Sequence, residues 1–487
     1  MSSENFEKAK LFFLKGLNFF QGENYDLAEK NLLESLKLLP QRMSTIHNLI
    51  SIYIVTNQKK KLKELLENNV HFNHKKEILY GIAFDFYFDK KFSESIKICM
   101  ELINYKNFRY SIQDLLASNY KKKKLFLKSL NIYKNKVREK KDYLIYYNMG
   151  CLFLELGKIS KANLYFNKSR DFKNIDVSNL WNLSLCSLTL KNFKYGFSLY
   201  EYRWLKKVNP VIKKFIKLKS PINVSYIDNK NILISDEQGL GDTLQFSRFV
   251  IDLLQYNANI TFVVNSKLTE ILSNLHKDIS VVNYDNLKFE NFDYHISLCS
   301  LPKFLNIDKI EDINYYKLNI DNKKNKILKK NNQLDIGLAW SGNPNFHSDE
   351  YRSINFKNFE KLLNISNINY YKLSQKTKYD ETADYNLISN LYDFGNKSFL
   401  EISQILKDLD LVISCDTSII HLAGILNIKS ILLLNYNSDW RWFRDKKKTI
   451  WYPSVQIIKQ NKFNIWDDVF KELEDIIEKL QTEKLKK

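Results

Sequence analysis

The first two hundred residues repeat with a period of 33 or 34, and no other feature of the chain constrains its fold as strongly. A small or medium residue recurs once in each copy: Gly16, Ile50, Ala83, Ala117, Gly150 and Ser184. Twelve positions later come Ala28, Leu62, Ser95, Ser129, Ala162 and Gly196, and four further on Leu32, Leu66, Cys99, Tyr133, Phe166 and Tyr200. This spacing predicts pairs of antiparallel helices that approach closely at the small residues, with the larger residues between successive pairs.

The pattern resembles the tetratricopeptide (TPR) repeat. It predicts an α-solenoid of about six repeats over residues 1–207, with an extended concave face of the kind that holds peptides or proteins. A purely structural buttress is the alternative. The last copy runs into the aromatic segment Tyr200 to Trp204, which we expect to be the seam with the next domain because buried aromatic side chains often join domains.

After residue 221 apolar strands alternate with helical patterns, which predicts parallel sheets covered by helices. A lysine- and asparagine-rich stretch, 321–332, divides this region into two Rossmann-like halves, 226–320 and 333–487. The predicted strands are Ile232–Ser235, Ile260–Val264, Ile279–Val282, Tyr294–Ser297, Ile336–Ala339, Asn369–Leu373, Leu411–Ser414 and Ser430–Leu434. The predicted fold class is therefore α plus α/β, a TPR α-solenoid followed by two Rossmann-like halves.

The segment 231–250 reads as a strand, a glycine turn and a helix. We expect Gly239 and Gly241 to adopt positive φ and bring the backbone close to a ligand, and Asp242 and Thr243 to cap the helix beside amides that favour anions. An ordinary turn with a capping Asp is the alternative. The dinucleotide fingerprint fails, because Leu244 stands where its third glycine belongs.

Ligands of such sheets bind at the carboxyl ends of the strands, so the loops that follow strands hold the candidate binding residues. Those loops are polar and four of them are expected to meet at one cleft. With the glycine turn, they give these candidates for substrate binding: Gly239, Gly241, Gln245, Ser341, Gly342, Asn343, Arg352, Gln375, Lys376, Asp416, Thr417, Ser418, His421, Asp439 and Trp440.

Five stretches in this order carry a second resemblance: ISDEQGLGDTLQFSRF, GLAWSGNP followed by Arg352, LSQK, DLVISCDTSIIHLAG and DWRWF. They resemble bacterial proteins that join a TPR array to a glycosyltransferase of the heptosyltransferase-like family 9. The resemblance implies a GT-B fold with an acceptor side in the first half and a nucleotide-sugar donor in the second. It also implies inverting transfer without a metal or cofactor, and a last helix, Trp466 to Leu480, that crosses back to the first half.

Within the resemblance, Asp242 matches the residue thought to be the general base. Asp416, Thr417 and His421 match the D-T-x-x-x-H segment that contacts the donor, but Ser418 replaces the usual glycine. The chemistry agrees, because one carboxylate must take a proton from the acceptor while other groups stabilise the departing diphosphate.

The helix that begins at Thr417, with Ser341, Arg352 and Lys376, can hold that diphosphate. A purely structural role stays open for several candidates: Asp416 as a helix cap, His421 as a buried, hydrogen-bonded ring and Trp440 as a packing residue. Asp408 and Asp410 spell the D-x-D of a metal site, but they precede their strand, so we interpret them as helix-end and turn residues.

The net charge of +20 comes from lysines spread along the chain, so we do not expect a nucleic-acid partner. Five scattered cysteines predict neither disulfides nor a zinc site. The absence of a long apolar run and the polar start predict no transmembrane segment and a cytoplasmic protein.

The sequence thus favours a glycosyltransferase that takes a nucleotide sugar and receives a protein or glycan acceptor on its TPR face. A non-catalytic TPR scaffold is the alternative, and the sugar, nucleotide, acceptor and oligomeric state stay open.

Overall fold

The computed structural model describes residues 3–69, 75–103, 109–172, 176–206, 218–288, 291–320, 333–346, 349–380, 388–443 and 447–485. The chain forms two compact units, Met1–Leu152 and Phe153–Lys487. The boundary lies inside the helical region that we predicted to continue to residue 207. The predicted divider 321–332, residue 207 and the last two residues of the chain lie outside the described residues.

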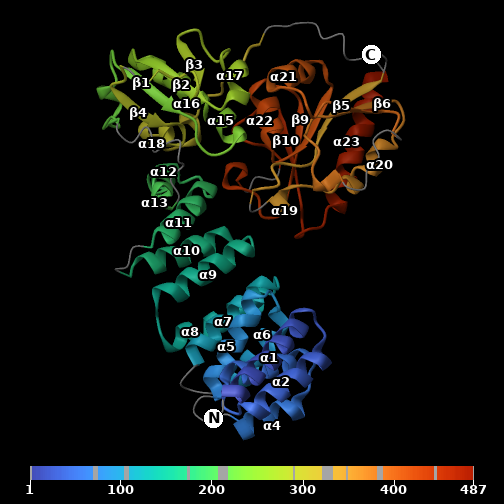
Figure 1. The fold of residues 1–487 in the computed structure, drawn as a ribbon. Coiled ribbons are helices and arrows are strands. Elements are labelled where there is room, and N and C mark those ends of the chain that lie inside the picture. Colours follow the sequence, from blue (N-terminus) through green and yellow to red (C-terminus); the bar gives the residue numbers. More distant parts are fainter. Residues whose placement is uncertain are drawn as a thin grey trace. The chain divides into compact units, whose positions relative to one another are not determined.

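Among the residues described before position 201, twelve helices form the six hairpins that the repeat predicts, and the first four hairpins belong to the first unit (Figure 1). The helices are α1 (Ser3–Gln21), α2 (Tyr25–Leu38), α3 (Met43–Val55), α4 (Lys59–Asn69), α5 (Lys75–Phe88), α6 (Phe92–Leu102), α7 (Arg109–Lys122), α8 (Phe126–Glu139), α9 (Tyr143–Glu155), α10 (Ile159–Arg170), α11 (Val177–Thr189) and α12 (Phe193–Tyr200). A short helix, α13 (Arg203–Lys206), follows them.

The small residues of the repeat lie where the two helices of a hairpin meet. A Cβ on Gly16 would stand 2.7 Å from Leu32 Cγ, so glycine permits the close approach of α1 and α2. A serine stands at the contact between the two helices of a later hairpin. The Ser95 hydroxyl of α6 donates to the Ala83 carbonyl of α5 at 2.6 Å. The predicted twelve-residue spacing is thus a physical contact.

The second unit contains two parallel sheets. The first sheet has the order β3-β2-β1-β4 and the second β10-β9-β8-β5-β6-β7. Their strands are β1 (Asn231–Ser235), β2 (Asn259–Val264), β3 (Ile279–Asn283), β4 (Tyr294–Ser297), β5 (Leu334–Ala339), β6 (Ile368–Lys372), β7 (Leu391–Asp393), β8 (Leu411–Cys415), β9 (Ser430–Leu434) and β10 (Val455–Lys459). Both orders reverse beside the first strand, which creates a switch point between β1 and β4 and another between β5 and β8.

The second sheet is buried on both faces. Leu432 and Leu434 point into one core, which includes α21 (Phe399–Asp408) and α22 (Ser418–Ile425), while Ile431 and Leu433 point into another, with α23 (Asp467–Leu485). Figure 1 shows α21 and α23 at different sides of the red and orange strands. The first of these cores continues into the first sheet and the last helical hairpin, so these parts share one apolar interior. The predicted fold class is confirmed.

Two details differ from the prediction. The strands β7 and β10 were not predicted, and the last helix does not cross back to the first half. Helix α23 stays on the second sheet, where Val469, Phe470 and Leu473 are buried and the Phe470 ring meets that of Phe359 at 4.9 Å. Its apolar face is satisfied there, which removes the driving force for a crossing.

Candidate active site

The two halves meet where the loops after β1 and β8 lead into helices. Helix α15 (Leu240–Phe246) packs against α22, and a Cβ on Gly241 would lie 2.8 Å from the His421 ring and 3.5 Å from Ser418 Cα. Gly241 therefore permits a close approach between the halves. The expected positive φ is wrong for both glycines of this turn: Gly239 has φ −96°, and the positive value of 67° falls on Gln238.

Asp242 lies in the first turn of α15 rather than at its N-cap, which is Gly239. One carboxylate oxygen accepts the Gly239 amide at 2.9 Å, and the other is 2.5 Å from Arg441 Nη2, in the second half. Burial raises the pKa of Asp242, and the Arg441 charge opposes that rise. The candidate base is thus held in an ion pair between the halves.

Arg441 is the centre of this polar cluster, although it is not among the candidate residues selected above. It lies on a short 3-10 helix, Trp440–Trp442, after β9, and its side chain is 9% exposed. Besides Asp242 it contacts Asp439 at 2.8 Å and donates to Gln238 Oε1 at 3.2 Å. Burial acts to lower the pKa of Arg441, but the charges of Asp242 and Asp439 outweigh it and raise that pKa, so the guanidinium is charged. The DWRWF motif was the available signal.

The last helical hairpin contacts the same cluster. The buried Tyr200 hydroxyl accepts Gln238 Nε2 at 2.8 Å, and Arg203 forms a two-point contact with Glu237, at 2.6 and 2.9 Å. Arg203 also donates to Glu201 at 2.6 Å. The segment Tyr200 to Trp204 therefore contacts the sheet domain, as predicted. Buried charged side chains form this contact together with the aromatic rings.

Asp416 follows β8 and Thr417 caps α22 by accepting the Ile419 amide. Burial, with the nearby Asp439 charge, raises the pKa of Asp416 to about 6. His421 Nε2 lies 3.9 Å from the Asp416 carboxylate. Burial, and then the Arg441 charge, lower the pKa of His421 to about 3, so its ring is neutral. Ser418 opens α22 and is half-buried.

His421 is held by contacts on one ring face and at one nitrogen. Its ring stacks on Trp442 with centroids 5.1 Å apart, and Nδ1 pairs with the Tyr452 hydroxyl at 2.9 Å. Neither partner was selected from the sequence. A buried, neutral, oriented imidazole can donate or accept one hydrogen bond through Nε2.

Arg352 joins the loop after β5 to Asp416. Its Nη1 donates to the Asp416 carbonyl at 3.1 Å, and its Nε donates to Asp349 at 3.0 Å. A Cβ on Gly342 would lie 2.6 Å from the guanidinium, so the glycine leaves room for it. Ser341 is buried and its hydroxyl accepts from Thr377, whereas Asn343 is exposed and accepts the Asn345 amide.

The remaining candidates lie in different surroundings. Gln375 and Lys376 are exposed in the loop after β6. Gln245 is fully buried, and neither of its amide atoms has a hydrogen-bond partner among the described residues. Trp440 is 3% exposed and its ring lies about 6 Å from those of Phe197 and Tyr200, an arrangement typical of packing.

Asp408 and Asp410 are structural, as predicted. Asp408 ends α21, and Asp410 accepts the Asp335 amide at 2.8 Å and pairs with Lys484 at 2.5 Å. Across the described ranges, no group of three or more His, Cys, Asp or Glu side chains is placed to hold a metal ion. None of the described helices combines the length and apolarity that a membrane span requires.

No protein-family model matches the chain, and no curated protein matches it. Among solved structures it is similar to the iron-containing dodecameric glycosyltransferase TibC from enterotoxigenic E. coli, with 12% identity over 50% of this chain and 66% of that one and a TM-score of 0.37. It is similar to E. coli heptosyltransferase WaaC with ADP, with 12% identity, 50% and 99% coverage and a TM-score of 0.35. Pseudomonas aeruginosa pilF matches at 13% identity over 42% of this chain and 94% of its own, with a TM-score of 0.27.

Proposed function

We propose that the chain is a glycosyltransferase that moves a sugar from a nucleotide-sugar donor to a hydroxyl group. The observation that carries this proposal is the ion pair of Asp242, from the first half, with Arg441 from the second. The neighbouring Gly241 lies against His421, which is 3.9 Å from Asp416. The carboxylate of Asp242 faces the Arg441 guanidinium. The segments that follow β1 and β8 meet beside this pair, and each of these strands borders a switch point of its sheet. Open α/β sheets bind their ligands at such points.

In the proposed reaction Asp242 takes the proton of the acceptor hydroxyl as that oxygen attacks the anomeric carbon and the nucleoside diphosphate leaves. Attack from the face opposite the leaving group inverts the configuration. Arg441 and Arg352 supply positive charge toward the diphosphate, so transfer needs no metal ion. His421 Nε2 offers one further hydrogen bond to the donor.

Asp242 can act as a base only when its carboxylate is free to accept a proton. In the structure it is paired with Arg441, which lowers its affinity for protons. A bound diphosphate competes with Asp242 for the guanidinium, and partial release of Arg441 makes the carboxylate more basic. We propose that donor binding activates the base in this way, before the acceptor reacts.

The test is thermal unfolding of the full chain with ADP, UDP, GDP, CMP or dTDP. A ligand of the folded state stabilises it by about 2.7 kcal/mol at a hundredfold excess over its dissociation constant. We expect one nucleotide to raise the unfolding temperature, and Asp416→Ala to lose that response. Asp468→Ala, which changes an exposed residue of α23, should keep it.

A lack of response to all five nucleotides would favour the non-catalytic TPR scaffold, and an unchanged response of Asp416→Ala would remove the assigned donor site. Asp242→Asn then separates binding from catalysis. It should keep the nucleotide response and lose transfer from the matching nucleotide sugar by roughly 10²- to 10⁴-fold. Undiminished transfer would exclude Asp242 as the base.

A further inference from the structure

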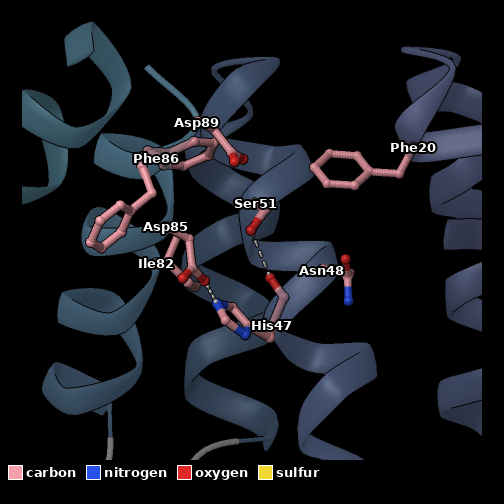
Figure 2. A pocket seen from close by; sticks show the side chains of 9 residues that line it. Phe20, His47, Asn48, Ser51, Ile82, Asp85, Phe86 and Asp89 are labelled. Atoms are coloured by element: carbon pink, nitrogen blue, oxygen red, sulfur yellow. Dashed lines mark hydrogen bonds and ion pairs between the residues drawn. The ribbon is translucent and has the colours of Figure 1, made fainter. Parts of the chain in front are cut away.

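A hollow of about 270 Å³ lies in the first unit between α1, α3 and α5. Figure 2 shows Phe20 of α1 on one side, Asp85 of α5 on the other and Ser51 of α3 between them. Its lining is Phe20, His47, Asn48, Ser51, Ile82, Asp85, Phe86, Phe88 and Asp89. Its volume lies below the roughly 300 to 1,000 Å³ of sites that enclose a whole small molecule. It therefore suits a single side chain better than a nucleotide sugar.

The hollow is acidic although the chain as a whole carries a net charge of +20. Asp85 and Asp89 lie four residues apart, at the end of α5 and in the turn after it, so their carboxylates share one side of the helix. Of the described lining residues only His47 can carry positive charge, and its Nε2 lies 3.2 Å from Asp85 Oδ2. The Asp85 side chain is 62% exposed and thus accessible to a partner.

Aromatic rings complete the lining. Phe86 is 3% exposed and forms part of the wall, whereas Phe88 is 67% exposed and its ring contacts that of Phe84 at 5.2 Å. An exposed ring beside carboxylates offers an apolar surface for an aliphatic stem and a π face for a cation. The Asn48 side chain, from α3, adds an amide at the edge of the hollow.

We propose that this hollow binds a lysine or arginine side chain of a peptide segment, with the cation at Asp85 and Asp89 and the stem against the rings. Phosphate-rich ligands are disfavoured by the two carboxylates. A neutral glycan would use the rings but would leave both charges without a counterpart. The inference rests on the proposed function in one respect, because it specifies the acceptor that the helical array presents as a basic polypeptide.

The test is selection of a random dodecapeptide phage library on the immobilised full chain. We expect the selected peptides to be enriched in lysine or arginine at a common position. A synthetic copy of one selected peptide should bind Asp85→Asn/Asp89→Asn at least tenfold more weakly. Asp26→Asn/Glu34→Gln removes the same charge from α2, which does not line the hollow, and should bind like the parent chain.

Three outcomes would overturn the proposal: no enrichment, enrichment of acidic or uncharged positions only, or equal binding by the Asp85/Asp89 variant and the parent. Displacement of the peptide by a neutral oligosaccharide such as maltohexaose would instead assign the hollow to glycans. Circular dichroism of the variant checks that its helices are intact. None of these measurements uses a nucleotide or transfer, so their failure is distinguishable from failure of the proposed activity.

Discussion

Two aspartate contacts, Asp85 with His47 and Asp242 with Arg441, lie in opposite environments. In the first unit Asp85 meets His47 with 62% and 40% of the side chains exposed. In the second unit Asp242 meets Arg441 with 22% and 9% exposed. Water competes for the first pair, so its groups remain available to a ligand. The second pair is largely shielded from water, so each partner depends on the other until a ligand replaces it.

The largest effect should come from Arg441→Met. This change leaves Asp242 and Asp439 without their cation at a buried contact between the halves. Loss of one member of a buried pair destabilises a protein by about 3 to 5 kcal/mol. We expect the free energy of unfolding of the second unit to fall by that amount in guanidinium titrations followed by tryptophan fluorescence.

The double variant Asp242→Leu/Arg441→Met is the matched control, because it removes both charges. It should recover much of the loss, since burying neither charge avoids the desolvation cost. A loss below about 1 kcal/mol in the single variant would mean that water reaches the pair. The Asp242–Arg441 contact would then be as open to water as the Asp85–His47 contact.

Much of the fold could be predicted because its signals are local. The spacing of Gly16 and Leu32 reflects one helix–helix contact, and the apolar run 430–434 is a strand buried on both faces. The strand β7 has only three residues, too few for a pattern. The path of α23 depends on Phe359, more than a hundred residues away, so its own amphipathic pattern does not specify its partner.

The site could be predicted only in part, for the same reason. Asp242 and Asp416 follow strands in recognisable loops, whereas Arg441 matters through contacts with Asp242 and Gln238, about two hundred residues earlier. No local spacing encodes that meeting. The prediction of positive φ at Gly239 and Gly241 was wrong. Gly239 has an ordinary φ, and Gly241 is needed because a side chain there would collide with His421.

A smaller effect is expected from Asp416→Asn, and it depends on pH. Burial raises the pKa of Asp416 from 3.8 to about 6, so between these values the folded chain binds a proton that the unfolded chain has released. Stability of the parent chain should therefore fall as pH rises through this window. The asparagine variant lacks the titration and should gain on the parent, by at most about 3 kcal/mol above pH 6.

The measurement is urea unfolding of both proteins from pH 4 to 7. Asp467→Asn, in the exposed first turn of α23, serves as the control and should show no such trend. A difference between Asp416→Asn and the parent that stays constant with pH, or that shrinks as pH rises, would contradict a buried, proton-binding Asp416. Asp416 would then resemble the solvated Asp85 rather than the buried Asp242.

The smallest effect on stability is expected from Asp85→Asn. The contact with His47 is exposed, and even a fully charged exposed pair contributes only about 0 to 1 kcal/mol because solvent screens it. We expect the unfolding temperature of the first unit to be nearly unchanged, with a free-energy difference within about 0.5 kcal/mol. The same substitution should weaken binding of the selected basic peptide, because it removes the carboxylate that pairs with the peptide's cation. The fold itself does not depend on that carboxylate.

The contrast between these two readouts decides what the Asp85 contact is for. His47→Gln removes the partner and leaves the carboxylate, so it should preserve stability and keep or strengthen peptide binding. If Asp85→Asn instead destabilised the first unit by more than about 1.5 kcal/mol, the contact would be a structural one. Weaker peptide binding would then reflect a damaged helix pair. If Asp85→Asn leaves the stability unchanged and weakens peptide binding, the exposed Asp85 carboxylate is available to a partner. The largely buried Asp242, by contrast, stays paired with Arg441.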